Sequence, residues 1–320
     1  MVKWAKELLN TNPKEVMKYG WEERDNCLWG IFWWEIIVVG WESWSWKTTI
    51  CNQIANNVSK SWHRVVKYSL ENRLENAAKE ELFYMCNRLR RKDWRKPYKR
   101  WPFIANEYWK DWSMYDIMFD DYIRKAYKEL IKSDVIELDK DRNVTIEDLV
   151  KLMDEEIEKW TRLFIIDHLH YFIFNDNERL DLQIKNVMHI LNEMARNNNI
   201  AIILVAHYRN TTWWERWRGM KPNPSYFRDS SSLKQVAHKI IQLVRDEDDD
   251  NCDLEVTKFY FTKFRWPLQD LVFVATFDLD YYEYRFWLPT MWIVKKEEKD
   301  IDIFNDMETE TEFNINNING

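Results

Sequence analysis

The chain is short of glycine, of paired cysteines and of long apolar runs. Glycine occurs 5 times in 320 residues, against a usual share of about 7%. The cysteines, Cys27, Cys51, Cys86 and Cys252, have no paired spacing, which argues against a disulfide framework and against zinc. The longest apolar run, around Glu35–Gly40, is far below the roughly 20 residues of a membrane span, and no secretory signal is present. We therefore expect a cytoplasmic protein with no membrane partner.

Tryptophan, in contrast, is in large excess. There are 20 tryptophans and 5 glycines, and their sum of 25 is an ordinary glycine count for a chain of this length. Most tryptophans fall at joints between predicted elements. They include Trp33 and Trp34 before a strand, Trp62 and Trp160 between a helix and a strand, Trp94, Trp101, Trp109 and Trp112 in polar turns, and Trp213, Trp214 and Trp217 in a loop.

These joints favour glycine, because the end of a helix commonly needs a residue with positive φ. We therefore hypothesise that many tryptophans stand where the native protein has glycine. Some genetic codes read UGA as glycine, and translating such a gene with UGA as tryptophan gives this substitution. The alternative is a genuinely tryptophan-rich protein, and the codons decide between the two.

Charge is unevenly distributed. The net charge is -7, and Lys296–Gly320 contains two lysines and eight acids, so the remaining residues are close to neutral. We expect three regions: a short lead-in helix at 1–27; one folded domain at 28–290; and an acidic, disordered tail at 291–320. Overall acidity does not exclude a nucleic-acid partner, because local basic stretches decide that.

Short apolar strands alternate with helical patterns along the domain. Strands are predicted at Glu35–Val39, Arg64–Ser69, Leu163–Ile166 and Ile200–Ala206, and helices at 47–59, 73–135, 145–159 and 180–196. Thr145 and Asp148 resemble a capping box. Four further strands, starting near Lys239, Leu254, Leu271 and Tyr281, follow one another with turns between them. This order predicts an α/β fold with a mostly parallel central sheet, flanking helices and an antiparallel C-terminal extension.

A phosphate-binding loop can be read between the first strand and its helix. Its residues are Trp41, Glu42, Ser43, Trp44, Ser45, Trp46, Lys47, Thr48 and Thr49. With glycine at positions 41, 44 and 46 the segment becomes a complete Walker A motif, in which backbone N–H groups wrap the phosphates of ATP. Lys47 would reach the β- and γ-phosphates, and Thr48 would supply a hydroxyl to Mg²⁺. With tryptophan at 46 the side chain would occupy the place of the phosphate.

Asp167 ends the buried strand Leu163–Ile166, as expected of a Walker B carboxylate that holds Mg²⁺. His168 and His170 are close enough to suggest another metal, but nothing else completes a site, so packing or polar contacts are favoured for them.

Several motifs together resemble the C-terminal motor domain of DnaB-type replicative helicases, a family of RecA-like P-loop NTPases. The resemblance covers about 28–287. It implies that Glu71, in Tyr68-Ser-Leu-Glu, polarises the attacking water, and that His207 senses the γ-phosphate. It also implies that Lys263 and Arg265, in Thr262-Lys-Phe-Arg-Trp-Pro, reach the nucleotide of a neighbouring subunit, with Arg265 as the arginine finger. The alternatives are a solvated acid at Glu71, a structural histidine at His207 and surface charges at Lys263 and Arg265.

Two basic stretches are candidates for contact with nucleic acid. Arg209, Arg216, Arg218 and Lys221 lie in a predicted loop that, by resemblance, would hold the backbone of single-stranded DNA. The stretch 88–100, with eight basic residues, is by default a solvated face or an intersubunit surface.

The sequence therefore predicts an ATP- and Mg²⁺-dependent DNA helicase motor, assembled as a homo-oligomer, most simply a hexameric ring, with ATP between subunits. The first alternative is a RecA-like ATPase of recombination, repair or regulation without unwinding activity. If the tryptophans are native, a nucleotide-free interaction module is the second alternative.

Overall fold

The computed structural model describes most of the folded domain. The described residues are 16–21, 25, 30–41, 47–69, 74–104, 120–133, 135–139, 145–169, 179–207, 222–223, 225, 227, 230–245, 254–264, 271–278, 281 and 283–286.

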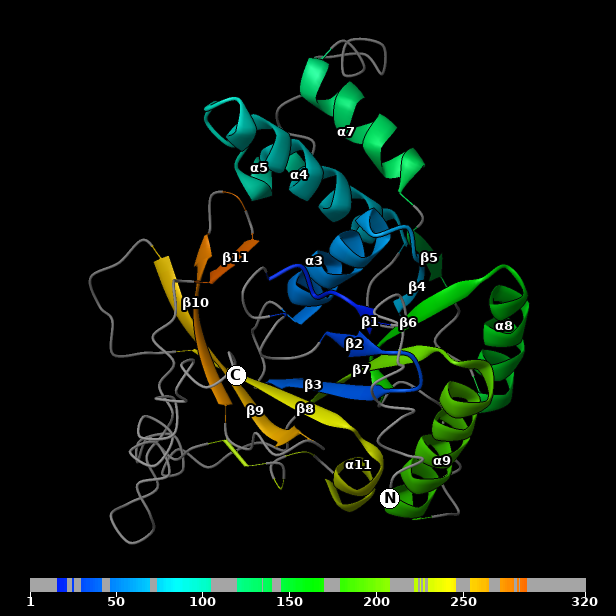
Figure 1. Ribbon diagram of the computed structural model, residues 1–320. Coiled ribbons are helices and arrows are strands. Elements are labelled where there is room, and N and C mark those ends of the chain that lie inside the picture. Colours follow the sequence, from blue (N-terminus) through cyan, green and yellow to red (C-terminus); the bar gives the residue numbers. More distant parts are fainter. Residues whose placement is uncertain are drawn as a thin grey trace, which may run out of the picture.

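A nine-stranded sheet forms the centre of this described part (Figure 1). Its strands are β3 (Ile36–Trp41), β4 (Arg64–Ser69), β5 (Val135–Asp139), β6 (Thr161–Asp167), β7 (Ala201–His207), β8 (Lys239–Arg245), β9 (Leu254–Phe264), β10 (Leu271–Asp278) and β11 (Glu283–Phe286). They lie in the order β11-β10-β9-β8-β3-β7-β6-β4-β5. All neighbours from β8 to β5 are parallel, whereas β9, β10 and β11 pair antiparallel. The predicted α/β fold is confirmed. The strand that starts at Lys239 was predicted to belong to the antiparallel extension, which is wrong, because β8 pairs parallel with β3 and the antiparallel part begins at β9.

Helices cover both faces of the sheet (Figure 1). One face carries α3 (Lys47–Lys60) and α4 (Leu74–Lys92), with α5 (Arg100–Ile104) and α7 (Asp121–Lys132) packed on α4. The other face carries α8 (Ile146–Glu158), α9 (Leu180–Asn198) and α11 (Ser230–Val236). Because both faces are covered, the central strands β3 and β7 are apolar over nearly their whole length. On β3, Val39 packs with Ile50 of α3, and Val38 packs in the cluster that contains Leu191 of α9. None of the helices in the described ranges is long and apolar enough to cross a membrane.

Local sequence signals account for several element ends. Thr145 Oγ1 accepts a hydrogen bond from the backbone N–H of Asp148 at 3.2 Å, and Asp148 Oδ2 accepts one from the N–H of Thr145 at 3.3 Å. The predicted capping box is therefore confirmed at the start of α8. Two short elements were not predicted: β5, which lies within or beside a region read as helical, and a hairpin of β1 (Val16–Met17) and β2 (Ile31–Phe32). Both are too short to show a clear apolar period.

A buried ion pair fixes the N-terminal hairpin to the sheet. Lys239, at the start of β8, is 1% exposed, and its Nζ lies 2.8 Å from Glu35 Oε2 and donates to the carbonyl of Gly30. The same Glu35 oxygen accepts from the N–H of Phe32 at 3.1 Å. Burial lowers the pKa of Lys239, whereas Glu35 and Asp25 oppose this by favouring the charged form. The pair thus joins the hairpin, β3 and β8 at the amino edge of the sheet.

Replacing Lys239 with methionine should lower the free energy of unfolding by about 3–5 kcal/mol, because Glu35 would be left as an unpaired buried charge. The double variant Lys239→Met, Glu35→Gln should recover much of this loss, since the charge is removed with its partner. Urea unfolding followed by circular dichroism measures both. Equal stability of the two variants would show that the ion pair is not what holds this edge.

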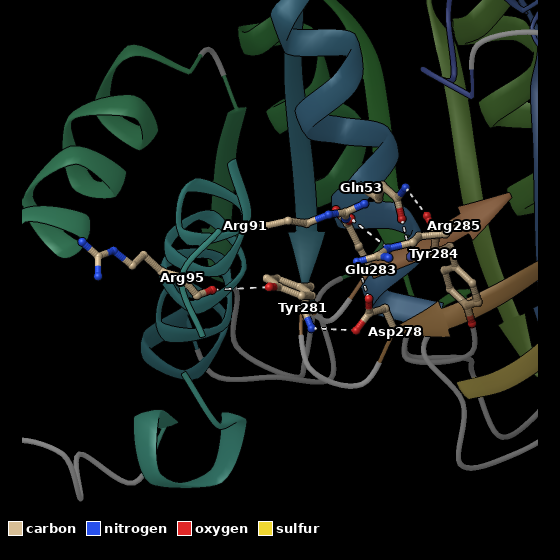
Figure 2. Close-up of polar contacts among 8 residues, drawn as sticks. All are labelled: Gln53, Arg91, Arg95, Asp278, Tyr281, Glu283, Tyr284 and Arg285. Atoms are coloured by element: carbon tan, nitrogen blue, oxygen red, sulfur yellow. Dashed lines mark hydrogen bonds and ion pairs between the residues drawn. The ribbon is translucent and has the colours of Figure 1, made fainter. Parts of the chain in front are cut away.

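The C-terminal hairpin, formed by β10 and β11, is fixed to α3 and α4 by polar contacts (Figure 2). Gln53 of α3 donates from Nε2 to the carbonyl of Tyr284 and accepts at Oε1 from the N–H of Tyr284, both at 3.0 Å. Arg91, in the last turn of α4, forms an ion pair with Glu283 and lies 5.5 Å from the ring centre of Tyr281. The amide of Gln53 is therefore hydrogen-bonded to the N–H and carbonyl of Tyr284 that face away from β10 on the edge strand β11.

Candidate functional site

The predicted phosphate-loop threonine and Walker B aspartate meet at the carboxyl edge of the sheet. Thr48, in the first turn of α3, donates from Oγ1 to Oδ2 of Asp167 at 2.9 Å. Asp167 ends β6 and is 6% exposed. The two residues are 119 positions apart in the sequence. They meet because β3 and β6 run parallel, separated only by β7, so both strands end at the same edge.

The other strand ends gather around this pair. The backbone of Trp41, which ends β3, is in register with that of His207, which ends β7. Ser69, which ends β4, is in register with Asp167. Glu71 follows two residues after Ser69 and lies outside the described residues, as do 42–46 of the loop. This edge, where parallel strands end and a helix begins, is the usual ligand-binding edge of an open α/β sheet.

The oxygen ligands at the carboxyl ends of these strands fit Mg²⁺. The Thr48 hydroxyl and the Asp167 carboxylate are oxygen ligands of the kind that Mg²⁺ prefers, and Mg²⁺ takes its remaining ligands from water and phosphate. Within the described ranges, no group of three or more His, Cys, Asp or Glu residues is placed to hold a metal. His168 is buried, in keeping with packing, and His170 lies outside those ranges.

Lys263 lies at the opposite edge of the sheet from Thr48 and Asp167. It pairs with Ile240 near the amino end of β8, whereas Asp167 lies at the carboxyl end of β6 in the parallel part of the sheet. Its Nζ donates to the backbone carbonyls of Lys234 and Gln235 at the C-terminus of α11. Arg265, two residues later, lies outside the described residues. Lys263 and Asp167 of one chain therefore lie toward opposite strand ends of the sheet.

The structure describes the first predicted basic stretch, 88–100, but not the basic residues of the second. In the first, three arginines make contacts within the chain: Arg90 lies 4.2 Å from the ring centre of Tyr98, Arg91 pairs with Glu283, and Arg100 pairs with Glu80. These contacts join α4 to its neighbours. In the second stretch, Arg209, Arg216, Arg218 and Lys221 lie outside the described residues.

Tryptophans occupy backbone conformations that suit glycine. In the described residues, five residues other than glycine have positive φ: Trp34 (84°), Trp62 (65°), Trp94 (54°), Trp160 (67°) and Asn199 (51°). The positive φ expected at positions 62 and 160 is thus confirmed. Trp62, Trp160 and Asn199 play equivalent parts, each joining the end of a helix to the next parallel strand. Asparagine tolerates this conformation, whereas a bulky side chain costs roughly 1–2 kcal/mol there.

Solvent exposure separates the tryptophans with positive φ from a tryptophan of the core. Trp62 and Trp94 are 96% exposed and Trp160 is 74% exposed, so their rings contribute little to the core. Trp21, in contrast, is 4% exposed and packs between Tyr19, with ring centres 4.7 Å apart, and Phe286, at 4.6 Å. Trp21 therefore behaves as a genuine core tryptophan, and the positive-φ tryptophans do not.

Trp62→Gly and Trp160→Gly should each raise the free energy of unfolding by about 1 kcal/mol, because the strained backbone is relieved and little packing is lost. Trp21→Gly should lower it by about 3–5 kcal/mol, because it empties a packed core position. Chemical unfolding followed by far-UV circular dichroism avoids the change in fluorescence. A loss of stability at position 62 or 160 would count against glycine there.

Comparison with known proteins adds the family. The family model for the DnaB-like helicase C-terminal domain matches residues 17–271. This chain belongs to that family. The matched DnaB-like segment contains the predicted phosphate loop, Thr48, Asp167, His207 and Lys263.

Solved structures share the fold of this DnaB-like domain. A DnaB-like replicative helicase, described with its interactions with primase, superposes with a TM-score of 0.73 at 19% identity, over 88% of this chain and 65% of that chain. The ATPase domain of G40P superposes with a TM-score of 0.73 at 18% identity, over 88% of this chain and 95% of that one. The chain thus spans somewhat less than two thirds of the first protein and nearly all of the second. No match was found among curated protein sequences.

Proposed function

We propose that this DnaB-like domain is an ATP- and Mg²⁺-dependent motor that translocates on single-stranded DNA and unwinds duplex DNA. The contact between Thr48 and Asp167 carries this proposal, because these are the two side chains that a P-loop ATPase uses to hold Mg²⁺ against the nucleotide. Family membership supports the helicase function over other RecA-like activities.

Each predicted residue has a chemical role in this proposal. Lys47 would hold the β- and γ-phosphates, Thr48 and Asp167 would hold Mg²⁺, and Glu71 would orient the attacking water. Mg²⁺, when bound, would neutralise charge that develops on the phosphate oxygens. His207, next to Trp41 in the sheet, would respond to the γ-phosphate.

The placement of Lys263 supports an ATP site that two subunits share. Since Lys263 lies toward the strand ends opposite Thr48 and Asp167, Lys263 and Arg265 would act on the nucleotide of a neighbouring copy. A closed ring, most simply a hexamer, provides such a neighbour for every subunit. There Arg265 would stabilise the charge of the transferring phosphoryl group.

We also propose that positions 41, 44 and 46 carry glycine in the native protein. The positive φ of four exposed or partly exposed tryptophans elsewhere supports this. UGA codons at these positions would agree with it, and UGG codons would contradict it. Functional tests therefore use the loop-glycine protein, which is the full chain with Trp41→Gly, Trp44→Gly and Trp46→Gly.

The function is tested by measuring ATP hydrolysis by the loop-glycine protein with and without oligo(dT), and by strand displacement from a forked duplex. Stimulated hydrolysis with displacement is the expected result. Hydrolysis without displacement would favour the RecA-like ATPase of recombination or regulation. Absence of hydrolysis would leave the interaction module.

A further inference from the structure

A buried glutamine interrupts the apolar strand β8. Gln242 is 0% exposed and lies between Ile241 and Leu243, which are each 1% exposed. Because side chains alternate along a strand, Gln242 faces the same side of the sheet as Ile240, toward α9 and α11. Burial of an amide is costly unless both of its ends form hydrogen bonds.

Both ends of this amide are used. Oε1 accepts from the Thr262 hydroxyl at 2.6 Å, and Nε2 donates to the backbone carbonyl of Asn223 at 3.1 Å. Gln242 therefore connects Thr262 of β9 with Asn223, which is distant in sequence and belongs to no strand of the sheet. An apolar side chain of this size would fill the space but could not hold either partner.

The first partner lies at an irregularity of β9. Ile240 pairs with Lys263 and Ile241 pairs with Phe261, so Thr262 is an extra residue on β9. Such a bulge bends a strand and changes the direction of the residues that follow it. Those residues are Lys263 and, two positions later, Arg265. The bond from Thr262 to Gln242 thus helps to set the direction of Lys263 at the end of β9.

The second partner lies just after the predicted DNA-binding stretch. Asn223 follows Lys221 by two residues and comes after the buried Pro222. Its side-chain Oδ1 accepts from the backbone N–H of Ser225 at 2.8 Å and from the Ser225 hydroxyl at 2.9 Å. The Asn223 backbone is thereby held in a turn, with its carbonyl on Gln242. In the neighbouring strand, Gln242 is in register with Gly40, one residue before the end of β3.

We propose that Gln242 is a positioning residue that links the DNA-binding stretch 209–221 to the Lys263–Arg265 pair of the same chain, and so to ATP hydrolysis in the next subunit. This inference rests on the proposed function. DNA held by the stretch would act on Asn223, and the amide of Gln242 would pass the displacement to the bulge at Thr262.

The test compares ATP hydrolysis with and without oligo(dT) for the loop-glycine protein and for Gln242→Leu in the same background. The stimulation ratio is independent of the fraction of active protein, so partial unfolding does not change it. We expect the ratio to fall about fivefold or more, in the range of typical coupling between sites, while KM for ATP changes by less than about twofold. Thr262→Val removes only one hydroxyl and should lower the ratio in the same direction.

Gln53→Leu is the matched control. Gln53 is also a buried glutamine with two amide hydrogen bonds, but both go to Tyr284 at the sheet edge. It should lose stability and keep the stimulation ratio. An unchanged ratio in Gln242→Leu and Thr262→Val, or an equal fall in Gln53→Leu, would overturn the inference alone. A loop-glycine protein that hydrolyses ATP without responding to DNA would overturn the helicase proposal as well.

Discussion

The loop-glycine protein should bind Mg²⁺–ATP about 100-fold or more tightly than the chain with tryptophan at positions 41, 44 and 46. Hydrogen bonds to charged groups contribute about 1.5–3 kcal/mol each, so losing two backbone contacts to phosphate weakens binding by roughly 10²–10⁴-fold. The indole at position 46 would also occupy the space of a phosphate. Isothermal titration calorimetry with Mg²⁺–ATP measures the difference directly.

The control for this experiment changes three tryptophans elsewhere. Trp62→Gly, Trp94→Gly and Trp160→Gly together relieve three strained turns that lie outside the phosphate loop. This variant should be more stable than the parent and bind ATP no better. If it gained as much affinity as the loop-glycine protein, the effect would be one of stability and not of the loop. Equal, measurable binding by all three proteins would contradict the hypothesis that glycine is needed at 41, 44 and 46.

Mixing two inactive variants of the loop-glycine protein should restore ATP hydrolysis. Arg265→Ala removes the proposed arginine finger, and such a loss typically lowers the rate by about 10³–10⁵-fold. Asp167→Asn removes the Mg²⁺ carboxylate and should also abolish hydrolysis. Because Lys263 and Asp167 lie toward opposite strand ends of the sheet in one chain, each active site would combine two subunits. In a random mixed ring about a quarter of the interfaces would have both groups intact.

The recovery is measured as steady-state ATP hydrolysis after the variants have been unfolded, mixed and refolded together, or assembled from monomers. Recovery to roughly a quarter of the parent rate is expected. A mixture as inactive as its components would place Arg265 and Asp167 in the same site of one chain. The double variant, Arg265→Ala with Asp167→Asn, mixed with the parent controls for simple dilution.

Much of this architecture could be predicted because it depends on local pattern. The strands β3 and β7 are nearly continuous apolar runs, β4 and β6 contain shorter ones, and α8 starts at a capping box. The meeting of Thr48 and Asp167 follows from the same pattern, since parallel strands with helical crossovers end at one edge. The positive φ at Trp62 and Trp160 could also be predicted, because the end of a helix determines it locally.

The remaining features depend on contacts between distant segments. Lys239 reads as a charged strand end, and only the fold shows it buried against Glu35, 204 positions away. Gln242 falls within the strand predicted to start near Lys239, and the sequence assigns it no role. Its role depends on an extra residue in β9 and on the path of Asn223, and neither has a sequence signal beyond one amide among aliphatic residues. Residues such as these are found only when the tertiary structure is known.

The contact between Gln53 and Tyr284 also bears on how copies of the chain can associate. An open sheet edge offers backbone groups to any other strand and invites open-ended polymerisation. At β11 the outer N–H and carbonyl of Tyr284 are already bonded to a side chain of the same molecule. A second copy therefore cannot extend the sheet at this position. At Tyr284, β11 is therefore protected against open-ended stacking of sheets, and copies of the chain must associate through another surface.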